Sequence, residues 1–194
     1  MGNNTWSNML DPHPQARGTA KNTFTTWQDV AGVASDLSSL PATLGNELRK
    51  GTQGHLEARG EFSTTVTPTL QFGFIYNATP AAAGGTILAQ NAAVATGSGA
   101  AAWPWWAVLD FIVTVINGAS STIYVQGSTK MGTSLTAYGT EVIIPATAAA
   151  RAVTFDPTIK ALWGVGAAWG TSSVSNSITV DMFRADILNQ GKTS

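Results

Sequence analysis

The stretch from Glu57 to Tyr76, EARGEFSTTVTPTLQFGFIY, contains two runs of alternating apolar and polar residues on either side of a turn rich in Ser, Thr and Pro. A period of two sends successive side chains to opposite faces of a sheet, so one set can enter a core while the other meets solvent. The apolar sets are Leu56, Ala58, Gly60 and Phe62 before the turn and Leu70, Phe72, Phe74 and Tyr76 after it. The stretch therefore predicts two half-buried antiparallel strands.

The rest of the chain continues the same pattern, and no comparable run has helical spacing. Further strands are predicted over 24–33, 87–94, 103–116, 121–130, 138–144, 151–155, 160–169 and 176–188. About eight to ten short strands with turns between them are typical of a sandwich or jelly roll. We therefore predict an all-β fold, an antiparallel two-sheet β-sandwich (jelly-roll-like) that forms a single domain over 23–194. Residues 1–22 show neither periodicity and are predicted to form an extended N-terminal arm.

The run from Trp103 to Ile116 is apolar on both parities. This pattern indicates a central strand that is covered on both sides, or one whose outer face lies at a subunit interface. Asn117-Gly118 follows it and predicts a hairpin with a type I′ turn. Asp110 interrupts the run, and a buried carboxylate needs a partner. We expect Asp110 to be buried and paired with Arg151 or a loop amide, with catalysis as the less supported alternative.

The composition limits the partners of the chain. Charged residues make up 11% of the 194 residues and the net charge is -1, whereas an ordinary soluble domain has roughly 25% charged residues. Such a surface offers no footprint for nucleic acid, and its lack of charge favours burial against other copies or another protein. The most apolar window, 100–116, is broken by Pro104 and Asp110 and is too short to cross a bilayer. We therefore expect self-association, with no nucleic acid and no membrane.

The residue types needed for catalysis or cofactor binding are scarce. There is no Cys, and the two histidines, His13 and His55, are not spaced as a zinc site or placed as part of a nucleophilic triad. Glu57 and Glu61 fall on the surface parity, and the glycine-rich pieces lack the strand-to-helix setting of a phosphate loop. The sequence thus predicts no enzyme, no cofactor and no metal.

Two aromatic groups are candidates for partner binding. Trp6, Met9 and Leu10 lie in the N-terminal arm, where a solvated tail has little need of them. Trp103 and Trp105 share one parity of the WPWW motif beside Pro104, which confines the segment to an edge or a strand entrance. We predict interface anchors at these positions. Stacking of the tryptophans on sugar rings is the alternative.

Three pieces of sequence carry a resemblance to a known family. They are LRKGTQGHLEARGEFSTTVTPTLQFGFIY, ATGSGAAAWPWW and GTSLTAYGTEVIIPATAAARAVTFDPTIKALWGVGAAWGTSSVSNSITVDMF, in this order. The run from about Glu47 to Leu188 resembles virion proteins of tailed bacteriophages, described as capsid decoration, head-fibre or minor tail proteins. The resemblance implies a jelly-roll-like sandwich, a homotrimer and a place on the virion, without enzymatic activity.

The resemblance leaves two functions open. The first is a capsid decoration or spike protein that binds the major capsid protein or another virion protein, with the arm docking on the shell. The alternative is a tail-tip or fibre module, a minor tail protein, that recognises a host surface glycan.

Overall fold

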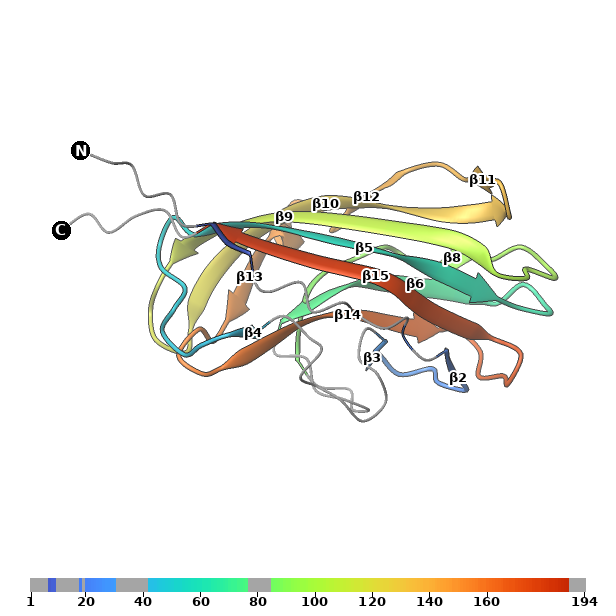
Figure 1. Ribbon diagram of the computed structural model, residues 1–194, viewed down its shortest axis with the longest axis horizontal. Coiled ribbons are helices and arrows are strands. Elements are labelled where there is room, and N and C mark those ends of the chain that lie inside the picture. The colour runs from blue at the N-terminus through green and yellow to red at the C-terminus, as the bar shows by residue number, and fades with distance from the viewer. Residues whose placement is uncertain (1–6, 10–17, 19, 31–41, 77–84, 189–194) are drawn as a thin grey trace.

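The computed structural model of the chain describes residues 7–9, 18, 20–30, 42–76 and 85–188. Two antiparallel sheets are stacked face to face (Figure 1). The alternation seen in the sequence decides which side chains lie between them. The predicted all-β, two-sheet sandwich is therefore confirmed.

The larger sheet has nine strands and is built around four long ones. In spatial order these are β15 (Ser177–Leu188), β5 (Gln53–Ser63), β9 (Trp103–Val115) and β10 (Ser121–Ser134). The short strands β1 (Ser7–Met9) and β2 (Lys21–Asn22) pair with β15. At the other side β11 (Ala137–Tyr138), β12 (Val142–Ile144) and β13 (Ala152–Phe155) pair with β10. A short 3-10 helix, Ala149–Arg151, precedes β13.

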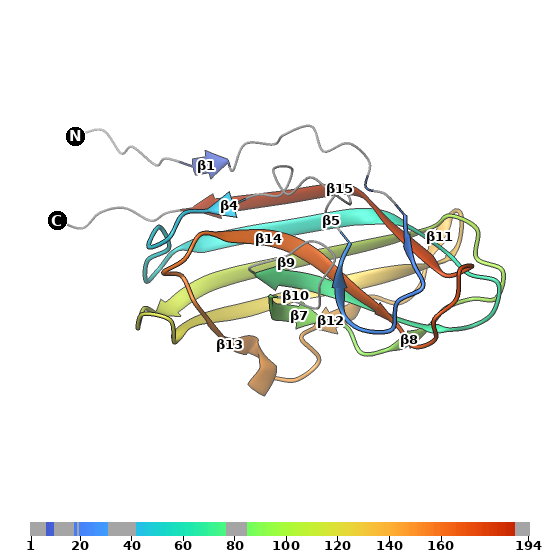
Figure 2. The same cartoon turned by 90° about the horizontal axis from the view of Figure 1, so that it is seen from below.

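The smaller sheet has six strands and covers the inner face of the larger one (Figure 2). Its main path is β3 (Gln28–Asp29), β14 (Ala161–Trp169), β6 (Thr69–Tyr76) and β7 (Thr86–Gln90). The short strands β4 (Ala42–Thr43) and β8 (Val94–Ala95) pair with β14 and β6. Within the described residues, the predicted strand over 24–33 is thus reduced to Gln28–Asp29.

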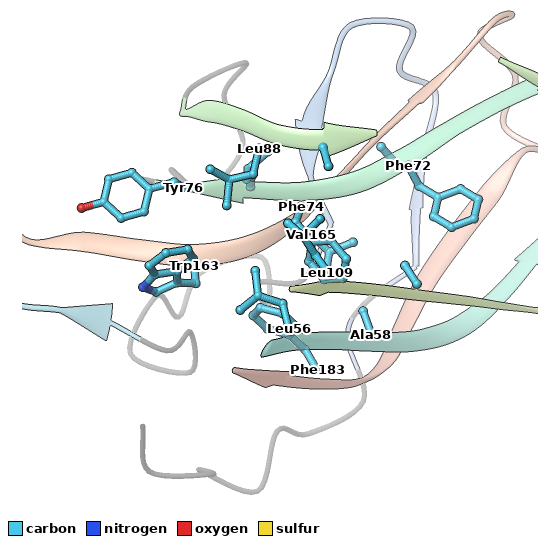
Figure 3. Packing of buried hydrophobic residues seen from close by; sticks show 14 of the residues in the cluster. Leu56, Ala58, Phe72, Phe74, Tyr76, Leu88, Leu109, Trp163, Val165 and Phe183 are labelled. Atoms are coloured by element: carbon cyan, nitrogen blue, oxygen red, sulfur yellow. The ribbon is translucent and has the colours of Figure 1, made fainter. Parts of the chain in front are cut away.

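The core lies between the two sheets and is rich in aromatic rings (Figure 3). The apolar parity of β5 and that of β6 both point into it, as predicted from their alternation. Phe111 of β9 stacks on Trp163 of β14 with ring centroids 5.0 Å apart, which joins the larger sheet to the smaller one. Burial of these rings supplies the main stabilisation, since the chain has no Cys to form disulfides.

The hairpin between β9 and β10 is confirmed, but its type I′ turn is not. Five residues, 116–120, connect the strands, and of the Asn117-Gly118 pair only Gly118 has a positive φ, at 55°. A type I′ turn needs a positive φ at both central residues. Here the Ser121 hydroxyl accepts from the Asn117 amide at 2.9 Å and donates to the Gly118 carbonyl at 2.8 Å. This side chain closes a longer loop in place of the tight turn.

The outer faces of the two sheets differ. Trp27 lies on the outer face of β14, where a Cβ atom added to Gly166 would come within 2.2 Å of Trp27 Nε1. The outer face of the nine-stranded sheet, in contrast, exposes side chains from β15, β5, β9 and β10. The nine-stranded sheet therefore presents a sheet surface that can contact other molecules.

The N-terminal segment is described only in part. Its strands β1 and β2 pair with β15, and the amide of Gly18 donates to the Val180 carbonyl at 2.8 Å. Trp6 and Leu10 lie outside the described residues, and Met9 is the last residue of β1. Docking of the arm over 1–22 stays a prediction.

Candidate functional site

A cavity of about 500 Å³ lies between the sheets, where β8 of the smaller sheet faces β10 of the larger one. Its apolar wall includes Phe72, Trp103, Met131 and Val142. Its polar wall consists of one amide and four hydroxyl side chains, Asn91, Thr96, Thr129, Thr133 and Thr140. A concave site of this volume with a mixed wall has the usual form of a small-ligand pocket.

Trp103, one of the predicted partner-binding residues, forms part of the cavity wall. It is half-buried at the start of β9, where its ring packs edge to face on Phe62 with centroids 6.2 Å apart. The ring also lies against the backbone of Gly97, since a Cβ atom there would come 2.3 Å from Trp103 Cζ3. The indole is thus held in a fixed position beside the cavity.

Trp105 does not lie at a surface, so its prediction as an interface anchor is corrected. Its side chain is 0% exposed, and its ring packs on Phe72 of the opposite sheet with centroids 5.2 Å apart. The indole Nε1 donates to the Thr179 carbonyl at 3.1 Å. Trp103 and Trp105 do share one parity, as predicted, but that parity faces the core.

Trp106 lies on the outer face of β9. It is not among the partner-binding residues that the sequence predicts. Arg59 of β5 and Lys130 of β10 are its direct cross-strand neighbours. Trp106 Nε1 donates to Glu57 Oε1 at 3.1 Å, and Lys130 Nζ lies 5.2 Å from the ring centroid. Its position on the parity opposite to Trp105 was the signal that could have identified it.

The charged groups around Trp106 balance each other. Arg59 donates to Glu57 Oε1 from Nε at 2.9 Å and from Nη2 at 2.6 Å, and Lys130 Nζ lies 3.1 Å from Glu141 Oε2. The hydrogen bonds from Arg59 and then from Trp106 lower the pKa of Glu57. A depression of about 180 Å³ lies among Arg59, Trp106, Lys130 and Tyr138. This site offers an aromatic ring within a locally neutral network of hydrogen-bonding groups.

Asp110 is exposed, so the prediction that it is buried is wrong. Its side chain is 73% exposed on the outer face of β9, because Asp110 falls on the parity opposite to the buried Leu109 and Phe111. The expected pairing is present, but the partner is His55 of β5, with Nδ1 and Oδ1 2.7 Å apart, and not Arg151. The catalytic alternative depends on a carboxylate buried among apolar side chains. The exposed Asp110 does not have these surroundings.

The outer face of the nine-stranded sheet also exposes apolar side chains. Met182 of β15 is 65% exposed and lies beside Arg59 of β5. The exposed apolar and aromatic side chains of this face are Tyr124, Tyr138, Ile143, Met182 and Leu188. On β9 the inner parity is buried from Trp105 to Val113, while Trp106, Val108 and Ile112 of the outer parity are only half-buried. The strand is therefore central but not covered on both sides by described parts of the chain, and a subunit interface stays the prediction for its outer face.

The described residues contain neither a group of metal ligands nor a membrane-spanning helix. Among the described residues, no three His, Cys, Asp or Glu side chains are grouped so that they could hold a metal ion. His13 lies outside this part of the chain. No helix within the described ranges has the length and apolar character to span a membrane.

Comparisons with known proteins add little to this geometry. No protein-family model and no curated protein matches the chain. Among solved structures, the chain is similar to the CBM2 module of the evolved Dit of Lactobacillus casei BL23 phage J-1. The identity is 10%, the match covers 73% of this chain and 68% of that one, and the TM-score is 0.24. A similarity this weak establishes neither the fold nor the function of the chain.

Proposed function

We propose that the chain is a non-enzymatic structural protein of a bacteriophage particle, a capsid decoration or spike protein that assembles as a homotrimer and binds the shell. Such a protein acts by binding its partners and catalyses no reaction. The sequence resemblance, the low charge and the two-sheet sandwich support this proposal. The major capsid protein or another virion protein is the expected partner, with Trp6, Met9 and Leu10 as the docking residues.

The observation that carries the proposal is the outer face of the nine-stranded sheet. It places apolar side chains such as Met182 and Tyr124 among ion pairs that are already satisfied within the chain, such as Glu57 with Arg59. Exposed apolar groups among polar ones are typical of surfaces that bind proteins. Burying roughly 800 Å² on each partner is standard for a stable contact, and repeated sites on a particle add avidity.

Light scattering on the purified chain tests the assembly. We expect a trimer mass for the wild type and a smaller mass for Met182→Glu, because the new carboxylate would lose its hydration at the contact while the neighbouring Arg59 is already paired with Glu57. Val66→Glu is the matched control, since Val66 is also exposed but lies in the loop between β5 and β6. A monomeric wild type, or equal masses for all three proteins, would contradict assembly through this face.

Binding to particles tests the decoration. The full chain and a triple variant with Ala at Trp6, Met9 and Leu10 are mixed with particles that lack the protein and are then sedimented. We expect the full chain to sediment with the particles and the triple variant to remain in solution. If the triple variant sediments equally, the docking residues lie elsewhere; if neither does, decoration is wrong.

A second candidate function is recognition of a host surface glycan by a tail-tip or fibre module. The cavity beside Trp103 favours it, because aromatic and hydroxyl side chains together suit sugars. A glycan array probed with the purified chain tests this function, and labelling of the protein on intact virions distinguishes a tail location from a capsid location. An array without signal would contradict glycan recognition and leave decoration unaffected.

A further inference from the structure

We propose that the cavity beside Trp103 is a binding site for one neutral saccharide unit. This inference deepens the glycan-recognition candidate and rests on it, and it is independent of capsid decoration. The volume of about 500 Å³ lies within the range of small-molecule sites. The cavity is formed jointly by strands of the two sheets and by the loop residues that follow β7, β8 and β11.

The wall excludes a charged ligand. The side chains that line the cavity are aromatic, aliphatic, hydroxyl or amide groups, and none of them is ionisable. An ion that entered would lose its hydration without meeting an opposite charge, which is costly. This distinguishes the cavity from the depression at Trp106, where Arg59 and Lys130 lie beside the ring. The ligand of the cavity is therefore neutral.

Two buried polar side chains indicate that the ligand forms hydrogen bonds. Thr129 is 2% exposed and lines the cavity, and its hydroxyl can both donate and accept a hydrogen bond. Asn91 Oδ1 accepts from the Phe72 amide at 2.6 Å, which leaves the Nδ2 group of this buried side chain as its donor at the cavity wall. A hydroxyl-bearing ligand matches both groups.

The apolar wall fits the other half of a sugar. Trp103, Phe72 and Met131 present hydrocarbon and ring surface opposite the hydroxyl groups. A pyranose has one face of C–H groups that can pack on such surface while its hydroxyls bond to Thr and Asn. The apolar side chain of a partner protein would fill the space but would offer no hydrogen bond to Thr129 or to the Asn91 amide group, whereas a sugar hydroxyl offers one to each.

Amide chemical-shift mapping of the full chain tests the proposal. The probes are methyl β-galactoside and methyl α-glucoside as neutral sugars and glucuronate as the anionic counterpart. We expect shifts at residues 91–97, 129–133 and 139–142 with at least one neutral glycoside and none with glucuronate.

Two variants identify the site. Ala95→Trp places a large ring at an exposed position of the cavity wall and should abolish the shifts, whereas Ala119→Trp, in the loop after β9, should leave them intact. Thr129→Val keeps the shape and removes the hydroxyl, so it should weaken binding about tenfold. Thr122→Val, on the outer parity of the same strand, should bind as the wild type does. Thermal unfolding of each variant confirms that it is folded.

The possible failures are distinguishable. No shifts with either neutral glycoside, or shifts grouped around Trp106, overturn the proposal even if the array shows that the chain binds glycans. Unchanged binding by Ala95→Trp also overturns it. If Ala95→Trp changes the oligomer mass while neither sugar binds, the cavity receives a protein side chain and the saccharide assignment is wrong.

Discussion

Gly60 lies directly beneath the indole ring of Trp105. A Cβ atom on Gly60 would come 2.8 Å from Trp105 Cε2 and Cζ2 and 1.9 Å from the Thr179 carbonyl oxygen. The absent side chain lets the ring enter the core while its Nε1 reaches the same carbonyl at 3.1 Å. This contact between β5 and β9 explains why Trp105 is buried and Trp106 faces outward.

Gly60→Ala should destabilise the protein by about 1–3 kcal/mol or more, because the added methyl must displace backbone as well as the ring. Urea denaturation measures the free energy of unfolding. Gly139→Ala is the control, since its Cβ would come no nearer than 3.2 Å to Met131 O and 3.3 Å to Thr133 Cγ2. Equal stability of Gly60→Ala and the wild type would show that Trp105 does not occupy this position.

The fold could be predicted because the alternation in β5 and β6 leaves only one face for the core. The orientation of β9 could not be predicted, because Trp103 to Val115 is apolar on both parities and either one could have faced inward. The residues of β5 beside β9 determine which parity faces the core. The small residue Gly60 lies on the inner side beside Trp105, and Arg59 lies on the outer side beside Trp106. This pairing depends on strand register, which a single sequence does not show.

The same limit explains the errors at individual residues. The apolar residues around Asp110 in the sequence predict its burial, whereas its exposure depends on which parity of the strand faces outward. The cavity could not be predicted either, since Asn91, Trp103 and Thr129 belong to different strands or loops that meet only when the sheets stack. The Pro that follows Trp103 predicts an interface anchor there, and partner binding by Trp103 stays a prediction.

Asp110→Asn should change the free energy of unfolding by less than about 1 kcal/mol, because the hydrogen bond with His55 is exposed and water competes with it. Urea denaturation at neutral pH gives the value. His55→Gln serves as the companion variant, since removal of either partner should have a similarly small effect. A loss of several kcal/mol in Asp110→Asn would mean that the carboxylate is buried after all.

Glu57 should make the stability of the protein depend on acid pH. The hydrogen bonds from Arg59 and Trp106 lower its pKa in the folded state below the ordinary value of 4.5. A lowered pKa contributes stability that is present above the unfolded-state value and is lost as the pH falls through the folded-state value. The wild type should therefore lose stability below about pH 4.5, and Glu57→Gln should lose less over the same interval. Denaturation curves collected at successive pH values test this, and parallel losses in the two proteins would contradict it.

Tyr76 should make the stability of the protein depend on alkaline pH. Burial raises the pKa of Tyr76 from 10.0 to about 12, and its hydroxyl donates to the Asp156 carbonyl at 3.1 Å. A raised pKa stabilises the fold fully below the unfolded-state value, and this contribution is lost as the pH rises through the folded-state value. Stability should thus decline between about pH 10 and 12.

Tyr76→Phe tests this window because it keeps the ring contacts with Phe155 and Trp163 and removes the ionisable group. We expect the variant to lose less stability than the wild type between pH 10 and pH 12, the interval that separates the two pKa values of Tyr76. Ultraviolet difference spectra of the two proteins should assign the phenolate that appears near pH 12 to Tyr76. Ionisation of Tyr76 near pH 10 would show that the ring is accessible to water and would contradict its place between the sheets.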